Sequence, residues 1–241
     1  MKETKCLQGY VIKLSEYKDS DKIVTILAKD GFYSFHARGV KNVKSKNASS
    51  LLLFSYSSFL LEINGKNLLL KEATLLKEPP YSDSLIRMSS LSFISELISR
   101  LLVAEGNERI FSYLDKMFSL MREGFSEINL CLFFFAFLLK EIGYSLNVDE
   151  CVICHSKKDI VGLDIYEGGF VCKREEESSA KCLPSRILKI IRYIFKCEMD
   201  NLGSISFESK ECLQIIKILS DYLEQILAIK LRSLKPLELA V

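Results

Sequence analysis

Short hydrophobic runs separated by polar turns fill the first eighty residues of the chain, a pattern typical of β-strands. Asp30-Gly31 and Asn64-Gly65 are hairpin turn signals, and 15–21 is a polar stretch rich in turn formers. The segments predicted as strands are 7–14, 23–27, 32–38, 52–63 and 68–76. Five strands with two hairpins favour a small β-barrel, and the OB-fold is the five-stranded barrel that most often binds single strands. An SH3-like barrel has the same number of strands and stays open as an alternative.

The hydrophobic period changes after Pro79-Pro80, which ends the last strand and marks a domain boundary. Apolar residues then recur at helical spacing, with Asp83 as the expected N-cap of the first helix. The predicted helices are 83–102, 108–122, 126–143, a helix that starts near Pro184, and 209–231. The third is expected to begin at Ser126 and end at Gly143, and it is apolar almost all round, as at the centre of a bundle.

One segment, 147–182, interrupts the helices and carries four of the eight cysteines. Cys151 and Cys154 form a CxxC pair, and Gly168-Gly169 allows a second tight turn before Cys172. Two such turns bring three thiolates to one ion, which is how zinc knuckles are assembled. The sequence therefore predicts a zinc site in this insert.

The fourth zinc ligand stays open among Cys182, Glu175 and His155. A second CxxC beginning at 172 would place a cysteine at 175, but glutamate stands there. One alternative is a module that has lost its metal and keeps its shape through its apolar residues. A redox-active CxxC would need a thioredoxin-like βαβ setting, which the flanking helices do not supply.

These patterns together predict an α+β multidomain protein. The expected parts are an OB-fold barrel over 1–80, a helical domain over 81–146, a zinc-finger-like insert over 147–182, and C-terminal helices over 183–241 that pack on the helical domain.

Charge is distributed unevenly although the net charge is only +2. Residues 1–80 hold 13 Lys and Arg against 8 Asp and Glu, whereas the remainder is slightly acidic. Within the first part, 32–46 reads as an aromatic-rich strand that leads into a basic loop without an acidic residue. Positive charge beside flat rings is what a nucleic-acid backbone and its bases require, although a solvated basic loop has the same composition.

The residues predicted to contact phosphates are Arg38, Lys41, Lys44 and Lys46, with Lys22 and Lys13 as weaker candidates. Phe32, Tyr33 or His36 is a candidate for stacking on a base, but alternation along a strand prevents all three from facing outward. Asp19 and Asp21 lie two residues apart, and a solvated turn that helps to order Lys22 is favoured over a cation site.

No enzyme signature is present, because the sequence has no phosphate-binding glycine loop and its two histidines lie in unlike modules. The N-terminus lacks the apolar core of a signal peptide, and the longest apolar run, 130–139, is about half a membrane span. Cysteines scattered through a chain with ample core favour a reducing cytoplasm.

The order of modules and several local segments resemble the RecO family of bacterial DNA repair and recombination mediators. The segments that carry the resemblance are Gly9-Tyr10-Val11-Ile12, 16–24, 37–41 with Lys44-Ser45, Gly143-Tyr144 and Asp149-Glu150-Cys151. Position 175 departs from the family, since many members have cysteine there.

The resemblance implies an OB-fold that binds single- and double-stranded DNA, and an activity that anneals strands coated by single-strand binding protein. It also implies cooperation with RecR in loading RecA, action in the cytoplasm at the nucleoid, and a chain that is monomeric when alone. From the residues alone, an RNA- or tRNA-binding OB protein and a thiol or metal enzyme centred on Cys151 stay open.

Overall fold

The computed structural model describes residues 3–17, 19–42, 45–101, 108–175 and 180–241. The chain forms two compact units, one comprising Met1–Ser82 with Leu102–Ser119 and the other comprising Asp83–Leu101 with Leu120–Val241. Among the described residues, no helix combines the length and apolar character needed to cross a membrane.

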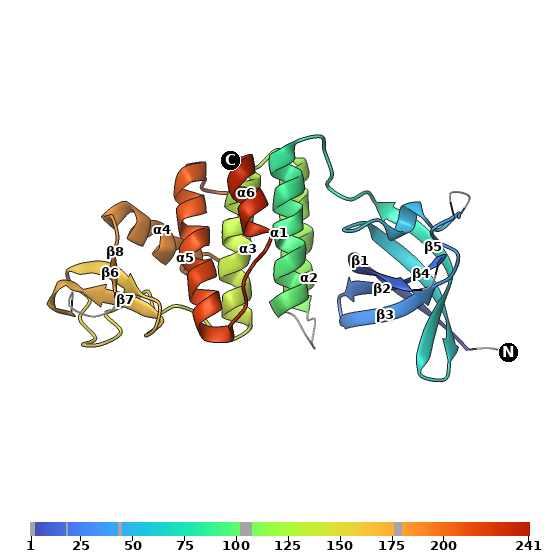
Figure 1. Ribbon diagram of the computed structural model, residues 1–241, viewed down its shortest axis with the longest axis horizontal. Coiled ribbons are helices and arrows are strands. Elements are labelled where there is room, and N and C mark those ends of the chain that lie inside the picture. Colours follow the sequence, from blue (N-terminus) through green and yellow to red (C-terminus); the bar gives the residue numbers. More distant parts are fainter. Residues whose placement is uncertain (1–2, 18, 43–44, 102–107, 176–179) are drawn as a thin grey trace. The chain divides into compact units, whose positions relative to one another are not determined.

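The first unit is built on a closed five-stranded barrel (Figure 1). Its strands are β1 (Thr4–Tyr17), β2 (Asp21–Ala28), β3 (Gly31–Ala37), β4 (Tyr56–Asn64) and β5 (Asn67–Lys77). They are hydrogen-bonded in the order β1-β2-β3-β5-β4, with β3 and β5 parallel where His36 pairs with Leu69. This pairing of β3 with β5 rather than β4 is the Greek-key arrangement of an OB-fold, so the predicted fold is confirmed.

Every strand boundary shifts by one to four residues from the prediction, and two of the shifts change the element to which a segment belongs. β1 continues to Tyr17, because Glu16 pairs with Lys22 and Tyr17 with Asp21, so the polar stretch 15–17 is strand rather than turn. The stretch 52–55 is not strand. It follows a short 3₁₀ helix, η1 (Ser49–Leu51), and contains the fully buried Phe54 in a left-handed conformation with φ 66°.

The barrel interior is filled by alternate residues of each strand, which pack against one another. They include Val11, Val24, Ile26, Phe35, Phe59 and Leu61. At the outside, α2 (Glu108–Arg122) packs against the fully buried Tyr10, whose ring lies 5.4 Å from that of Phe118 and 5.7 Å from that of Phe111. Lys77 Nζ donates to Asp115 Oδ1 at 2.7 Å, so α2 and the barrel are joined by both apolar and charged contacts.

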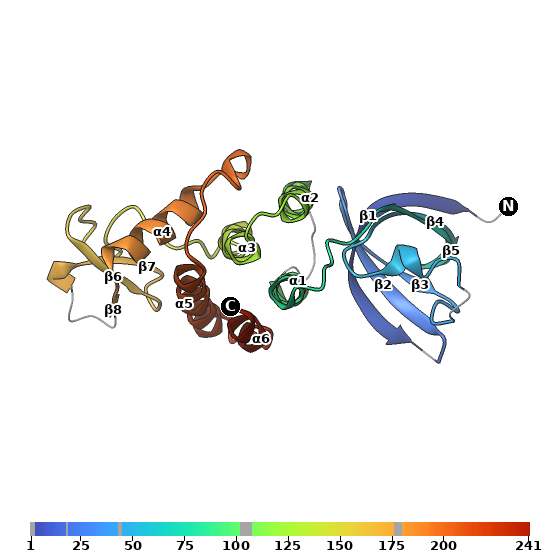
Figure 2. The ribbon, with the colours of Figure 1, turned by 90° about the horizontal axis from the view of Figure 1, so that it is seen from above.

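The second unit is a helical bundle with a small sheet. Its helices are α1 (Leu85–Leu101), α3 (Glu127–Glu141), α4 (Ser185–Lys196), α5 (Ser209–Leu227) and α6 (Leu234–Ala240). Figure 2 shows α3 among α1, α4 and α5, with which it makes contact. Nearly every residue of α3 is buried, which agrees with its apolar sequence and its predicted central position.

The helix ends are fixed by local hydrogen bonds. Ser126 caps α3 by accepting from the Asn129 N–H, and Gly143 follows the helix in a left-handed conformation with φ +84°, both as predicted. The expected Asp83 cap of α1 is wrong, because Ser84 occupies that position and accepts from the Arg87 N–H at 3.4 Å. α5 ends at Leu227 instead of 231, since Ala228 adopts a left-handed conformation, and α6 was not predicted.

The insert forms a three-stranded sheet in the order β7-β6-β8, from β6 (Ile160–Asp164), β7 (Gly169–Cys172) and β8 (Lys181–Cys182). Gly162 is required on the central strand, because a Cβ there would lie 2.8 Å from the carbonyl oxygen of Lys181. The central strand β6 contacts α4, so this strand anchors the insert to the bundle.

Candidate nucleic-acid interface and metal centre

The outward face of strands β1, β2 and β3 presents a mainly polar surface. Phe35 and Ala37 belong to the barrel core, so Ser34 and His36 point outward by strand alternation. The strand register places two rows across this face. They are Lys13, Thr25 and Ser34, and Ser15, Ile23, His36 and Leu69.

A groove of about 460 Å³ runs along this face where β3 meets the hairpin between β4 and β5. We call it the barrel groove, and its polar lining consists mainly of Tyr17, His36, Arg38, Asn64, Lys66 and Asn67. The rings of Tyr17 and His36 meet edge to face with centroids 4.9 Å apart, and Tyr17 is 43% exposed. Two cations, two amides and two rings therefore share one hollow on the face that OB-folds use for binding.

Asp21 links two parts of the chain at one end of this groove through hydrogen bonds. Its Oδ1 accepts from the backbone N–H of Gly39 at 2.9 Å, and its Oδ2 lies 2.8 Å from His36 Nε2. The Gly39 N–H is the main cause of the lowered pKa of Asp21, with further bonds from His36 and Ser20. Asp21 is only 9% exposed, so the prediction of a solvated turn is wrong at this residue.

The predicted phosphate-contact residues occupy different places. Arg38 lines the barrel groove, and the exposed Lys13 lies on the same outward face of the sheet. Lys22 and Lys41 instead approach the exposed Glu16, Lys22 at 4.0 Å and Lys41 in a direct ion pair. Lys46 is exposed, and Lys44 lies outside the described residues.

Tyr33 lies on the side of β3 opposite to His36. Its ring packs against the barrel core, Lys5 Nζ lies 4.3 Å from the ring centroid, and its hydroxyl donates to Asp30 Oδ2 at 2.7 Å. The structure therefore does not bring Tyr33 into the barrel groove.

Sequence reasoning missed four residues of the groove: Tyr17, Asn64, Lys66 and Asn67. Three of them belong to the hairpin that was identified only as a turn. The parallel contact between β3 and β5 places this hairpin beside Arg38, and a contact so distant in sequence gives no local signal.

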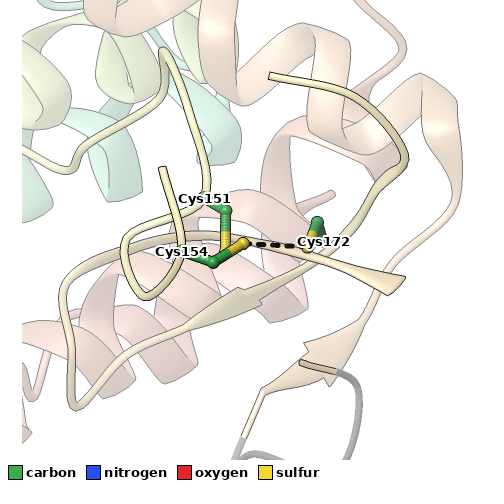
Figure 3. A group of neighbouring side chains, drawn as sticks. All are labelled: Cys151, Cys154 and Cys172. Carbon is green, nitrogen blue, oxygen red and sulfur yellow. Dashed lines mark hydrogen bonds between the residues drawn. The ribbon is translucent and has the colours of Figure 1, made fainter. Parts of the chain in front are cut away.

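The metal centre consists of Cys151, Cys154 and Cys172, whose sulfur atoms all lie within 4.8 Å of one another. The Sγ atoms of Cys154 and Cys172 are 3.5 Å apart, and Figure 3 draws this contact as a dashed line. The CxxC turn is closed by the bond from the His155 N–H to the Cys151 carbonyl at 2.9 Å, and β7 delivers Cys172. Three converging soft thiols are compatible with zinc.

Cys151 has the chemistry of a metal ligand. Burial of this fully enclosed residue would raise the pKa of its thiol, but the backbone N–H groups of Cys154, Cys172 and Ile153 outweigh burial and lower the pKa to about 7. A thiol that ionises this readily is available as the thiolate that zinc requires.

The candidates for a fourth ligand lie apart from the three sulfur atoms. Glu175 is half-buried in the 3₁₀ helix η2 (Lys173–Glu175), and Cys182 is exposed on β8. His155 Nδ1 lies 2.9 Å from Glu150 Oε1. Within the described ranges, no further cysteine, histidine or carboxylate ligand atom joins the group.

Comparison with known proteins agrees with this architecture. The family model described as Recombination protein O N terminal matches residues 1–79, and Recombination protein O C terminal matches residues 82–235. A DNA repair protein RecO of Bacillus cytotoxicus is 28% identical over 237 residues, covering 96% of each chain. A DNA repair protein RecO of Bacillus cereus strain B4264 is 29% identical with the same coverage. The resemblance found in the sequence is confirmed, and the chain belongs to the RecO family of DNA repair and recombination proteins.

Proposed function

We propose that this protein binds single- and double-stranded DNA through its barrel, anneals complementary strands, and with RecR helps to load RecA onto DNA coated by single-strand binding protein. Its place of action is then the cytoplasm, at the nucleoid. The observation that carries the proposal is the barrel groove, where Arg38, Lys66, Tyr17 and His36 share one hollow on the outward face of β3.

Single-strand binding follows from the chemistry of that hollow. Arg38 and Lys66 supply positive charge for two phosphates, and the exposed ring of Tyr17 offers a face for a base. Stacking contributes about 1–3 kcal/mol per base and accepts every base. Asn64 and Asn67 add donors and acceptors, but phosphates and ring faces carry little sequence information, so base preference should be slight.

Duplex binding needs only phosphate contacts. Lys13 is exposed on the outward face of the sheet, and Lys41 and Lys46 are exposed in the loop after Arg38. The barrel therefore offers further positive charge that can contact phosphates without opening the bases. Annealing is then a binding activity, in which neutralised strands approach and pair while no bond is made or broken by the protein.

For the insert we propose a structural zinc ion held by Cys151, Cys154 and Cys172, with Glu175 or Cys182 as the fourth ligand after local movement. When bound, the ion would supply a cross-link between the CxxC turn and β7. Elemental analysis of the purified chain tests this. We expect about one zinc per chain, loss in Cys172→Ser, and partial loss in whichever of Glu175→Ala and Cys182→Ser removes the fourth ligand.

Salt-dependent binding tests the DNA interface. Arg38→Gln with Lys66→Gln should weaken binding of a single-stranded oligonucleotide and make the slope of log affinity against log salt shallower by about 1.4, as expected for two lost phosphate contacts. Lys29→Gln with Lys116→Gln is the matched control, because both lysines are exposed in the same unit outside the groove lining. An unchanged slope in the groove variant would contradict the proposal.

The alternative of an RNA- or tRNA-binding protein is an outcome of the same experiment. An RNA oligonucleotide of identical sequence is compared with the DNA. Tighter binding of structured RNA, with no annealing of DNA strands, would favour the alternative.

A further inference from the structure

Annealing brings two strands together, and the barrel groove accounts for only one of them. The second unit contains a separate basic hollow of about 220 Å³ within the insert, which we call the insert hollow. Its lining consists of Ser156, Lys158, Asp159, Cys172, Lys173 and Arg174. No function assigned above uses its three cations.

The insert hollow is built by two chain segments that are fixed to each other. One follows the CxxC turn and the other follows β7, and Ile160 pairs with Cys172 in the sheet. The Lys173 N–H donates to the Asp159 carbonyl at 2.9 Å, next to that pairing. The backbone that carries Lys158 and the backbone that carries Lys173 and Arg174 are therefore held at a defined spacing.

Three cations line the hollow with one acidic residue, Asp159, so its lining carries a net positive charge. Lys158, Lys173 and Arg174 are exposed, and none of them makes an ion pair with any residue that the structure describes. Some other cations of the same unit are paired with acidic side chains. Lys196 lies 2.5 Å from Asp149, and Arg186 is bound by Glu211 through two contacts.

The size of the hollow limits what it can hold. Sites that enclose a small-molecule ligand measure roughly 300–1,000 Å³, so a hollow of about 220 Å³ is too small for a nucleotide but suits a single phosphate group. Arginine binds phosphate oxygens through paired N–H groups and lysine binds them as a point charge. The Ser156 hydroxyl adds a neutral donor.

We propose that the insert hollow binds the phosphate backbone of a second nucleic-acid strand, so that one chain holds one strand on its barrel and another on its insert. This inference rests on the proposed DNA-binding function, because a second strand has meaning only if the groove binds the first. Little base preference is expected at this site, because its lining offers cations and a hydroxyl but no aromatic ring.

Oligonucleotide stoichiometry tests the proposal directly. The probe is a thymidine oligonucleotide of about eight residues, within the site size of one OB-fold, and the number bound per chain at low salt is measured by native mass spectrometry. We expect two for the natural chain. The insert variant, Lys158→Gln with Lys173→Gln and Arg174→Gln, should bind one and should anneal complementary strands more slowly.

Three controls make the result decisive. Lys189→Gln with Lys210→Gln and Lys235→Gln removes the same charge from exposed positions of the second unit and should still bind two. Exchanging Lys158 and Lys173 for arginine keeps the charge and should also keep both oligonucleotides. Because Cys172 lines the hollow, elemental analysis must show equal metal content in all variants.

The outcomes separate this inference from the function on which it rests. An insert variant that still binds two oligonucleotides, or that behaves like its control, overturns the second-strand site. A natural chain that binds one, and loses it only in the Arg38 and Lys66 variant, also overturns that site but leaves the groove intact. A groove variant, Arg38→Gln with Lys66→Gln, that still binds two oligonucleotides overturns the groove instead.

Discussion

Asp21 accepts a hydrogen bond from the backbone N–H of Gly39 at 2.9 Å, so the first residue of β2 holds the start of the basic loop. The same carboxylate lies 2.8 Å from His36 Nε2, one of the rings of the barrel groove. Gly39 has φ +64°, a left-handed conformation that glycine adopts without strain and that turns the chain just after Arg38. The buried Asp21 carboxylate therefore fixes the backbone next to Arg38, a cation of the barrel groove.

Replacing Asp21 by Ala should weaken single-strand binding about three- to tenfold, the effect of losing roughly one charge-assisted contact, because Arg38 is then no longer held in place. The affinity of Asp21→Asn should lie between those of the natural chain and the Ala variant, since its side-chain oxygen can still accept from the Gly39 N–H. Fluorescence anisotropy with a labelled oligonucleotide measures the affinities. Equal binding by the natural chain and the Ala variant would show that Asp21 has no positioning role.

Replacing Glu16 by Gln should strengthen DNA binding about two- to threefold at low salt. The Glu16 carboxylate pairs with Lys41 and lies 4.0 Å from Lys22, so DNA must compete with it for both ammonium groups. Lys41 is also the main cause of the lowered pKa of Glu16, which keeps the carboxylate charged. The gain should vanish at high salt. Glu72→Gln removes one exposed acid elsewhere on the barrel and should show a smaller gain.

Replacing Tyr10 by Ala should destabilise the first unit by about 3–5 kcal/mol, the usual cost of emptying a large aromatic site. Tyr10 is fully buried between the barrel and the rings of Phe111 and Phe118, and its hydroxyl bonds to Asp115. Tyr10→Phe should cost much less, because only the hydroxyl is lost. Denaturant unfolding measures both values, and equal losses would contradict the packing role of the ring.

Glu96 should make the second unit sensitive to acid. Burial would raise the pKa of Glu96, but bonds from the Ser233 hydroxyl, the Ser233 N–H and the Arg232 N–H outweigh it, and the pKa is lowered from 4.5. A lowered folded-state pKa gives stability that is present above the unfolded value and is lost as the pH falls through the folded value. This contribution should therefore be complete near neutrality and decline below about pH 4.5.

The Glu96→Gln variant checks this linkage. It should cost about 1–2 kcal/mol at neutral pH, where it weakens the bonds that fix the start of α6, and the difference from the natural chain should shrink toward pH 3. Thermal unfolding followed over this range measures the difference. A gap that stays constant with pH would mean that the charge of Glu96 does not contribute.

Most of the fold was predictable, because its signals are local. Asp30-Gly31 and Asn64-Gly65 mark two of the hairpins, and Ser126 and Gly143 mark the ends of α3. The Asp83 cap failed because Ser84 offers a competing hydroxyl one residue later. Which of two adjacent polar residues caps a helix depends on packing, and the sequence alone does not reveal that packing.

The site was predictable only in part. Arg38 was expected and does line the groove, but Lys66 arrives there through the parallel contact of β3 with β5. Bulky residues occupy both faces of β3, so the pattern did not decide that Tyr33 faces the core and His36 faces outward. In the insert, the cysteine spacing predicted the three converging sulfur atoms but not the fourth ligand.

Cross-linking gives the most direct test of the barrel groove. A single-stranded oligonucleotide carrying 5-iododeoxyuridine is bound to the full chain and irradiated, and the modified peptides are identified by mass spectrometry. Strand binding in the barrel groove predicts cross-links on Tyr17 or His36, the exposed ring and its neighbour in the groove. Cross-links found only on Tyr33 or on the helices of the second unit, with Tyr17 and His36 unmodified, would contradict it.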